Sequence, residues 1–209
     1  MNEFPLEHAV YSCPEGGGYR FVAQSPGISE AWTHALQQIC TNFGERPPNV
    51  ACPHAVFVYP LDKMHVVLVQ VADKGVDDTG RPGALGFYLL ILPADLYRFL
   101  GGNPFQLADQ YPPLWDVRET IEPRICVPEM PPNRTVDELA EVLKGPHSAT
   151  TFGGAQALLD GGRLLIERDA PDEEIVRQLW KLLPTASRCE LWPTSFAFGN
   201  NLGFHVLVT

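Results

Sequence analysis

The sequence predicts an α+β fold in which mostly antiparallel strands form one or more mixed sheets packed by helices. The first observation is the order of the expected elements, which reads β-β-α-β-β-β before a connector and α-α-β-α-β-β after it. The second is that most expected strands are followed directly by another strand, as in hairpins. The third is that 45 % of the residues are hydrophobic, enough for a substantial core.

Proline divides the chain into three parts. Residues 112–134 are proline-rich and have few periodic apolar positions, which indicates an ordered connector or a boundary. We therefore expect an N-terminal α+β half at 1–111 and a C-terminal α+β half at 135–209. The two halves are either subdomains or parts of one integrated domain.

The N-terminal half begins with two short strands, HAVYS and YRFVAQS, joined by a turn. Ser29 is a suitable cap for the next helix, which places Leu36, Ile39 and Phe43 on one face and ends at Gly44.

Three apolar strands follow this helix, HAVFVYPL, MHVVLVQVAD and GALGFYLLILP. The second is apolar on both faces in its middle, so we expect it to be central, and the third is its expected antiparallel neighbour. Two short helices, ADLYRFLGG and PFQLADQYPP, complete this half.

The C-terminal half begins with two helices. Thr135 and Glu138 have capping-box spacing at the start of TVDELAEVLKG, and ATTFGGAQALLDGG is a second helix that its glycines weaken. A strand, RLLIERD, comes next. Pro171 then opens a helix whose buried stripe includes Leu179 and Trp180.

The chain is expected to close with a hairpin of CELWPTSFAF and GFHVLVT around GNNLG. Proline cannot donate to a strand ladder, so Pro193 predicts a bulge or an edge in the first of these strands. A strand–helix–strand unit at 163–198 would add one parallel pair.

The charge of the chain limits its partners. The formal net charge is −10, and Lys and Arg are scattered rather than clustered. Phosphate backbones and anionic membrane surfaces both require clustered cations, so we expect neither nucleic acid nor membrane as a partner. No apolar run reaches the length of a transmembrane helix, and no signal peptide pattern opens the chain.

The five cysteines are widely spaced and contain no CxxC pair. An odd number at wide spacing favours reduced thiols over a disulfide framework. The expected compartment is therefore the cytoplasm.

The loop before GALGFYLLILP contains Asp78-Thr79-Gly80, the triplet of aspartic proteases. That chemistry needs two such carboxylates in matching surroundings, and the chain contains only this copy. The loop is long for a hairpin, so it can also present Arg81 to a carboxylate or phosphate. A structural turn in which Arg81 pairs locally with an aspartate is the alternative that we favour.

No other motif assembles a catalytic or cofactor site. The sequence has no GxSxG, Walker or GxGxxG pattern, and CPH at 52–54 is too little for zinc. We therefore predict no catalytic residue, metal or cofactor. Trp115 and Trp192 adjoin prolines in irregular segments and are candidate anchors for a protein partner, with burial as the alternative.

Four segments resemble one bacterial family in their order along the chain, DDTGRPGALGFYLLIL, GGNPFQLADQYPP, ALLDGGRLLI and LWKLLPTASRCELWPTSFAF. The chain resembles the N-terminal domain of the bacterial GTPase-associated protein one group over most of residues 8–208. In the last segment, the residues that match the family pattern are Leu182, Leu183, Pro184, Arg188, Thr194 and Phe196.

The resemblance implies a regulatory partner of small Ras-like GTPases in bacterial signalling or conflict systems, without a set of catalytic residues. We expect a non-enzymatic regulatory or adaptor domain whose candidate partner-binding residues are Asp78, Arg81, Trp115, Arg188 and Trp192. The alternative is a hydrolase of unrecognised class, with carboxylate or thiol groups drawn from distant parts of the chain. A deep pocket with convergent ionisable groups would favour the hydrolase, and a flat apolar patch with a polar rim would favour the adaptor.

Overall fold

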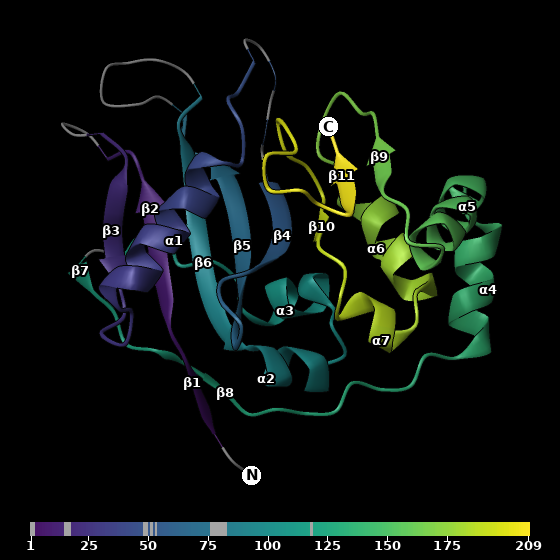
Figure 1. Ribbon diagram of the computed structural model, residues 1–209, viewed down its shortest axis with the longest axis horizontal. Helices are drawn as coiled ribbons and strands as arrows, with labels where there is room; N and C mark the ends of the chain where they lie inside the picture. Colours follow the sequence, from purple (N-terminus) through teal and green to yellow (C-terminus); the bar gives the residue numbers. More distant parts are fainter. Residues whose placement is uncertain are drawn as a thin grey trace.

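The computed structural model describes residues 3–14, 18–47, 50, 52, 54–75, 83–117 and 119–209. Within these residues the strands form one sheet of nine, in the order β7-β3-β2-β6-β5-β4-β10-β11-β9, and a two-stranded ribbon of β1 and β8 (Figure 1). The strands are β1 (Phe4–Leu6), β2 (His8–Ser12), β3 (Arg20–Gln24), β4 (His54–Pro60), β5 (His65–Asp73), β6 (Leu85–Pro93), β7 (Glu119–Thr120), β8 (Arg124–Cys126), β9 (Leu164–Ile166), β10 (Pro193–Thr194) and β11 (Val206–Val208).

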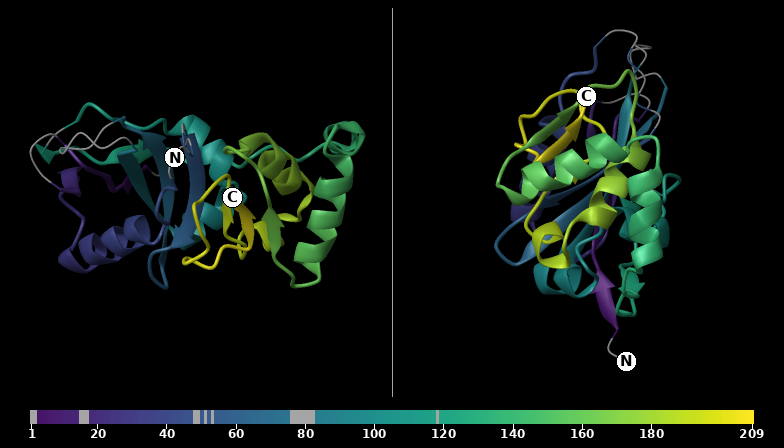
Figure 2. Two further views of the ribbon diagram at one scale, coloured as in Figure 1. Left: turned by 90° about the horizontal axis from the view of Figure 1, so that it is seen from above. Right: turned by 90° about the vertical axis from the view of Figure 1, so that its right-hand side faces the viewer.

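Helices cover both faces and one end of this sheet. They are α1 (Glu30–Thr41), α2 (Ala94–Phe99), α3 (Pro104–Gln110), α4 (Val136–Lys144), α5 (Ser148–Leu159), α6 (Glu173–Leu182) and α7 (Thr185–Arg188). Helix α1 lies on one face, and α2 and α3 lie on the opposite face, while α4, α5 and α6 gather at the β9 end (Figure 2). The predicted α+β class with a mostly antiparallel mixed sheet is confirmed.

The core centres on β5 and β6, which are buried along nearly their whole length. Their antiparallel pairing was predicted and is confirmed from His65 opposite Pro93 to Asp73 opposite Leu85. On the α1 face, the ring of Phe43 lies 5.7 Å from that of Phe57. Burial on both faces explains why these strands read as continuous apolar segments.

Helix α1 forms as its sequence predicts. The Ser29 side chain accepts a hydrogen bond from the Trp32 amide at 3.2 Å and caps the helix. Leu36 and Ile39 are buried against the sheet. Gly44 follows the helix with φ of +110°, a conformation that glycine adopts without strain.

Helix α4 also begins as predicted, with Thr135 and Glu138 forming its capping box. Helix α6 was predicted to open at Pro171 but begins at Glu173, because Asp172 caps it by accepting the amide of Ile175. Leu179 and Trp180 are fully buried on the inner face of α6. Within the described residues, no helix has the length and apolar character needed to cross a bilayer.

The predicted closing hairpin is wrong. Strands β10 and β11 pair in parallel, and β11 also pairs in parallel with β9, so β11 lies between them. The chain bends directly after Thr194, whose hydroxyl oxygen accepts the amide of Phe196 at 3.2 Å. Ser195 accepts the amide of Val56 at 2.8 Å, and these buried hydroxyls end the strand early.

Pro193 lies in the interior of the sheet rather than at an edge. Strand β10 is only two residues long and has β4 on one side and β11 on the other. Thr194 provides the pairing with Phe57 of β4, so the missing amide of Pro193 is not needed for that ladder.

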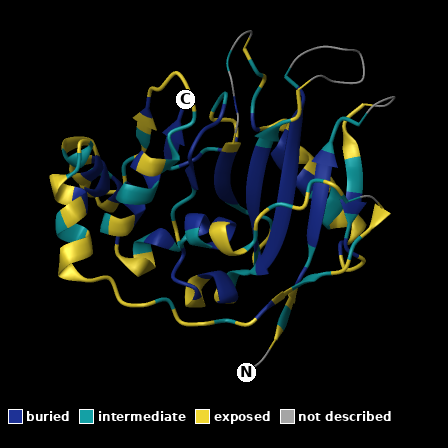
Figure 3. Cartoon of the chain, turned by 180° about the vertical axis from the view of Figure 1, so that it is seen from behind, coloured by how far each residue is buried: buried dark blue, intermediate teal, exposed yellow. Residues whose placement is uncertain are grey.

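The proline-rich connector contains two short strands that the sequence analysis did not predict. Its β7 pairs in parallel with β3 at the edge of the sheet, and β8 pairs with β1 in the antiparallel ribbon. Figure 3 shows the connector crossing the face of the buried central strands on its way to the C-terminal helices. The connector therefore forms a cover over the sheet face opposite α1.

Candidate functional site

The predicted contact residues lie in separate places. Asp78 and Arg81 fall outside the described residues, so their predicted role stays a prediction. Just before that loop, Lys74 lies over the ring of Trp115 at 4.1 Å from the ring centre. Trp115 belongs to the connector and is half-buried, and its ring meets that of Tyr88 edge-on at 6.4 Å.

Trp192 and Arg188 belong to the C-terminal half. Trp192 is half-buried and precedes β10, and its backbone amide donates to Nδ1 of His205 at 3.1 Å. Arg188 ends α7 and is 8 % exposed. Neither tryptophan presents a fully exposed ring, so both side chains contribute to packing where the structure places them.

The connector is fixed to the sheet by polar contacts from buried strands. Gln70 of β5 donates to the carbonyl of Tyr111 at 2.8 Å. His8 of β2 contacts the carbonyl of Glu122 through Nε2 at 2.8 Å. Because both side chains are almost completely buried, these hydrogen bonds are shielded from water. They attach the chain to the sheet at Tyr111, just before the connector, and at Glu122, within it.

Arg124 strengthens this attachment from the connector side. Its Nη1 donates to the carbonyl of Pro112 and to the hydroxyl of Tyr88, each at 3.4 Å. Its guanidinium also lies 5.5 Å from the ring centre of Tyr111, within cation–π range. Arg124 therefore joins β8 to β6 and to the start of the connector.

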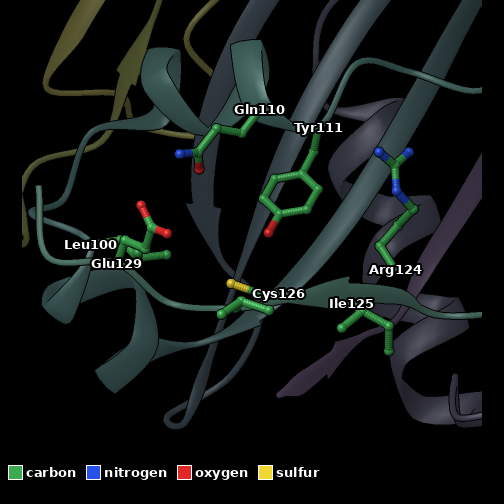
Figure 4. A pocket seen from close by; sticks show the side chains of 8 residues that line it. Leu100, Gln110, Tyr111, Arg124, Ile125, Cys126 and Glu129 are labelled. Atoms are coloured by element: carbon green, nitrogen blue, oxygen red, sulfur yellow. The ribbon is translucent and has the colours of Figure 1, made fainter. Parts of the chain in front are cut away.

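A pocket of about 450 Å³ lies where α3 meets β8. We call it the connector pocket, and its lining residues are Leu100, Gln110, Tyr111, Arg124, Ile125, Cys126, Val127 and Glu129. Figure 4 shows the Tyr111 hydroxyl pointing toward the Cys126 sulfur, with Arg124 and Glu129 on opposite sides of the pocket. The ionisable groups therefore do not converge on one point.

Neither the phenol nor the thiol of the connector pocket has the surroundings of an activated group. Burial, together with the neighbouring Cys126 thiol, raises the pKa of Tyr111, so its phenol keeps its proton at neutral pH. Cys126 is 2 % exposed, and a buried thiol of this kind is usually inert. Within the part of the chain that the structure describes, no cluster of three metal-ligating side chains occurs.

An apolar patch on the β1–β8 ribbon adjoins the connector pocket and shares Ile125 and Val127 with its lining. Pro5 and Ile125 are paired across the ribbon, and Val127 follows Ile125 by two positions, so all three can share one side. Ile125 is 54 % exposed and Val127 is 42 % exposed. Arg124 and Glu129 flank this patch along the chain, and we call the whole surface the ribbon patch.

Sequence reasoning missed the connector pocket and the ribbon patch because it treated 112–134 only as a proline-rich connector. The segment Arg124–Val127 does contain three apolar residues in a row after one charged residue. An apolar run that short is weak evidence for a strand, and its partner β1 was not predicted either.

Comparison with family models matches residues 10–133 to GTPase-associated protein 1, N-terminal domain type 2. The matched segment runs from β2 through the connector and includes every residue of the connector pocket. No curated protein and no solved structure matches the chain significantly. Because the family model covers more than half of the 209 residues, the chain belongs to the family of GTPase-associated protein 1, N-terminal domain type 2.

Proposed function

We propose that this chain is a non-enzymatic regulatory or adaptor domain that binds a small GTPase, with a Ras-like protein of a bacterial signalling or conflict system as the candidate. Membership of a GTPase-associated family supports an association with GTPases. The five free thiols favour the cytoplasm as the place of this interaction.

The ribbon patch is the observation that carries the proposal. Exposed apolar side chains on a regular strand with a charged rim are typical of protein interaction sites. The strand under the patch is held by β1 and by the Arg124 contacts. Little conformational entropy is therefore lost when a partner binds. The net charge of −10 adds long-range attraction toward a basic partner surface.

The hydrolase alternative has weaker support from the connector pocket. A general base or thiol nucleophile requires a pKa near or below the working pH, whereas the pKa of Tyr111 is raised. Among the lining residues there is no histidine that could activate Cys126. An adaptor role uses the same region without requiring a proton acceptor.

The test is a binding titration with a purified small GTPase, chosen first from the genes that neighbour the gene for this chain. Calorimetry is performed with the GTPase in its GDP form and with a non-hydrolysable GTP analogue. We expect Ile125→Asp to weaken binding by at least about tenfold, because it places a charge in the centre of an apolar contact.

Leu165→Asp is the matched control. Leu165 is 57 % exposed on β9, at the opposite end of the nine-stranded sheet from β7, so its substitution should leave affinity unchanged. Equal affinities for wild type and Ile125→Asp would contradict the ribbon patch as the binding surface. Arg81→Ala in the same titration tests the predicted contact from the loop.

Measuring GTP hydrolysis and nucleotide exchange in the presence of the chain separates a regulator from an adaptor. A regulator changes one of these rates, and an adaptor binds without changing either. Turnover of GTP or another substrate by the chain alone, without the GTPase, would support the hydrolase alternative instead.

A further inference from the structure

We propose that a second site, between α2, α4, α6 and α7, binds a phosphorylated small molecule through its phosphate group. The site is an open cleft of about 750 Å³, which we call the arginine cleft. Its lining includes Phe99, Met130, Arg134, Glu138, Lys181 and Arg188. This inference goes beyond the proposed GTPase association and does not depend on it.

The arginine cleft has positive charge in a strongly acidic protein. Arg134, Lys181 and Arg188 line it together with one acid, Glu138, which gives 3 − 1 = +2 within a chain of net charge −10. Among the described residues, none of the three cations forms an ion pair. The cleft therefore offers a net positive charge to an anionic ligand.

Glu138 offsets only part of this charge, and the capping box of α4 also occupies its carboxylate. One of its oxygens accepts the Thr135 amide at 2.7 Å and the Thr135 hydroxyl at 3.1 Å. The hydrogen bond from the backbone N–H of Thr135 is the largest of the effects that lower the pKa of Glu138. The carboxylate thus serves the helix terminus and makes no direct contact with Arg188.

Arg188 is the unusual residue of the cleft. It is 8 % exposed, its Nη2 donates to the Thr185 hydroxyl at 2.9 Å, and its buried Nε has no hydrogen-bond partner among the described residues. Burial, followed by the neighbouring Arg134, lowers the pKa of this guanidinium. A buried and unpaired cation is costly, and a bound oxyanion would offset that cost.

The backbone around Arg188 is held in place by close packing. Gly102 has φ of +63°, and a Cβ atom built there would lie 2.8 Å from the sulfur of Cys189. The indole of Trp180 donates to the Gly102 carbonyl at 2.8 Å. These contacts fix the turn before α3 against the end of α7, so Arg188 has a defined position before any ligand binds.

Arg134 and Lys181 occupy the other wall of the cleft. Nη1 of Arg134 donates to the carbonyls of Lys181 and Leu183 at the C-terminal end of α6. A guanidinium has five N–H donors, so other donors of Arg134 are available. The Lys181 side chain is exposed and flexible, and it can follow a ligand of variable size.

A phosphate matches this arrangement better than a carboxylate does. A phosphate monoester carries about −1.5 to −2 charges at neutral pH and three acceptor oxygens, which suits several cations and the planar fork of arginine. The volume of the cleft lies in the range typical for small-molecule sites. Phe99 and Met130, both partly exposed at 46 % and 75 %, supply apolar surface for the organic part.

The experiment compares phenyl phosphate, inorganic phosphate and benzoate as probes of the full chain. Phenyl phosphate and benzoate share a ring and differ in their anionic group, while inorganic phosphate lacks the ring. Calorimetry and ³¹P line broadening should show saturable binding of phenyl phosphate. We expect benzoate to bind at least about tenfold more weakly, because it meets only part of the charge.

Variants assign the binding to the arginine cleft. Arg188→Gln should reduce the affinity for phenyl phosphate by at least about tenfold, as expected for loss of charge-assisted bonds. Lys181→Gln should reduce it by about threefold, because an exposed lysine contributes less. Lys144→Gln is the matched control, since Lys144 is exposed on α4 and does not line the cleft.

Absence of saturable phenyl phosphate binding, or wild-type affinity in folded Arg188→Gln, would overturn the proposal. Equal affinity for benzoate would assign the cleft to carboxylates, such as acidic segments of a protein, and would also overturn it. If a melt shows that Arg188→Gln does not fold, the affinities of Arg188→Lys and Lys181→Gln for phenyl phosphate test the site instead. Unchanged affinity in both of these variants would refute the site.

Discussion

Strands β5 and β6 each contain nine residues, whereas β9, β10 and β11 contain three, two and three. The long strands are antiparallel to each other and to their outer neighbours β4 and β2, and they are buried on both faces. The short strands pair in parallel with one another, and β10 joins them to the long strands through an antiparallel pair with β4. Helices α5 and α6 pack beside them and supply much of the buried surface at that end.

This difference shows two ways of stabilising one sheet. The antiparallel part has enough continuous apolar strand to bury itself beneath α1, α2 and α3. The parallel part has too few strand residues for that and depends on Leu179, Trp180 and their helix. The family match ends at residue 133, so it covers the antiparallel part and the connector but not the parallel part.

The largest expected effects come from removing buried leucines in each part. Leu68 in β5 and Leu179 in α6 are both 0 % exposed. We predict that Leu68→Ala and Leu179→Ala each lower the free energy of unfolding by about 2–5 kcal/mol, because transfer and cavity terms add. Denaturant melts monitored by circular dichroism measure this loss.

The same melts test whether the two parts unfold together. We propose that they form one integrated domain, so each variant should retain a single transition. A separate early transition in Leu179→Ala alone would show that the parallel part is an independent unit. A loss under about 1 kcal/mol would mean that α6 does not pack as described.

A smaller effect should appear where α5 approaches β9. A Cβ atom on Gly154 would lie 2.7 Å from a methyl of Leu164, whereas one on Gly153 would meet nothing within 4 Å. Gly153→Ala should raise the free energy of unfolding by about 0.5–1 kcal/mol through helix propensity. Gly154→Ala should be at least about 1 kcal/mol less favourable than Gly153→Ala, because Leu164 must move.

Thermal and denaturant melts of these two variants together decide the outcome. Since both substitutions add the same methyl group to the same helix, their difference isolates the contact with Leu164. Equal stabilisation by the two substitutions would show that α5 and Leu164 are loosely packed and would contradict the close contact described for Gly154.

A still smaller effect is expected from the ion pair that joins the two parts. Arg177 of α6 donates two bonds to Asp109 of α3, at 2.9 and 2.8 Å, and its guanidinium lies 5.3 Å from the ring of Phe105. Arg177→Met keeps much of the packing and should cost about 0.5–1 kcal/mol at low salt. Repeating the melt at high salt should shrink this difference, and a salt-independent loss would indicate packing instead.

The smallest expected effect is a dependence of stability on pH. It arises from one histidine in the antiparallel part, His8, and one in the parallel part, His205. Burial lowers the pKa of both His8 and His205 in the folded state below the ordinary 6.5. The unfolded chain therefore binds more protons below that pH, so stability should fall as the pH drops below about 6.5. Arg124 and Arg163, respectively, lower these pKa values further.

His8→Gln and His205→Asn separate the two contributions. Glutamine can keep the donor toward Glu122, and asparagine can keep the acceptor for the Trp192 amide. Melts at pH 7 and at about pH 5 should show that each substitution reduces the loss of stability. Unchanged pH dependence in both variants would show that neither histidine titrates as proposed.

The sequence predicted those parts of the fold whose partners are close along the chain. The β5–β6 pairing, the Ser29 cap and the Thr135–Glu138 capping box all follow from residues within one or two elements. Local spacing is sufficient for such features because the bonding groups meet whenever the element forms. The GTPase-associated resemblance was likewise confirmed over residues 10–133.

The tertiary structure decided what depends on contacts between distant segments. Thr194 and Ser195 turn the chain through bonds to Phe196 and Val56, which places β11 between β9 and β10 instead of in a hairpin. The arginine cleft likewise gathers residues from elements far apart in sequence, from Phe99 to Arg188. The spacing of residues along the chain does not predict contacts between distant segments. Such contacts depend on hydrogen bonding and burial that arise only when the whole core packs.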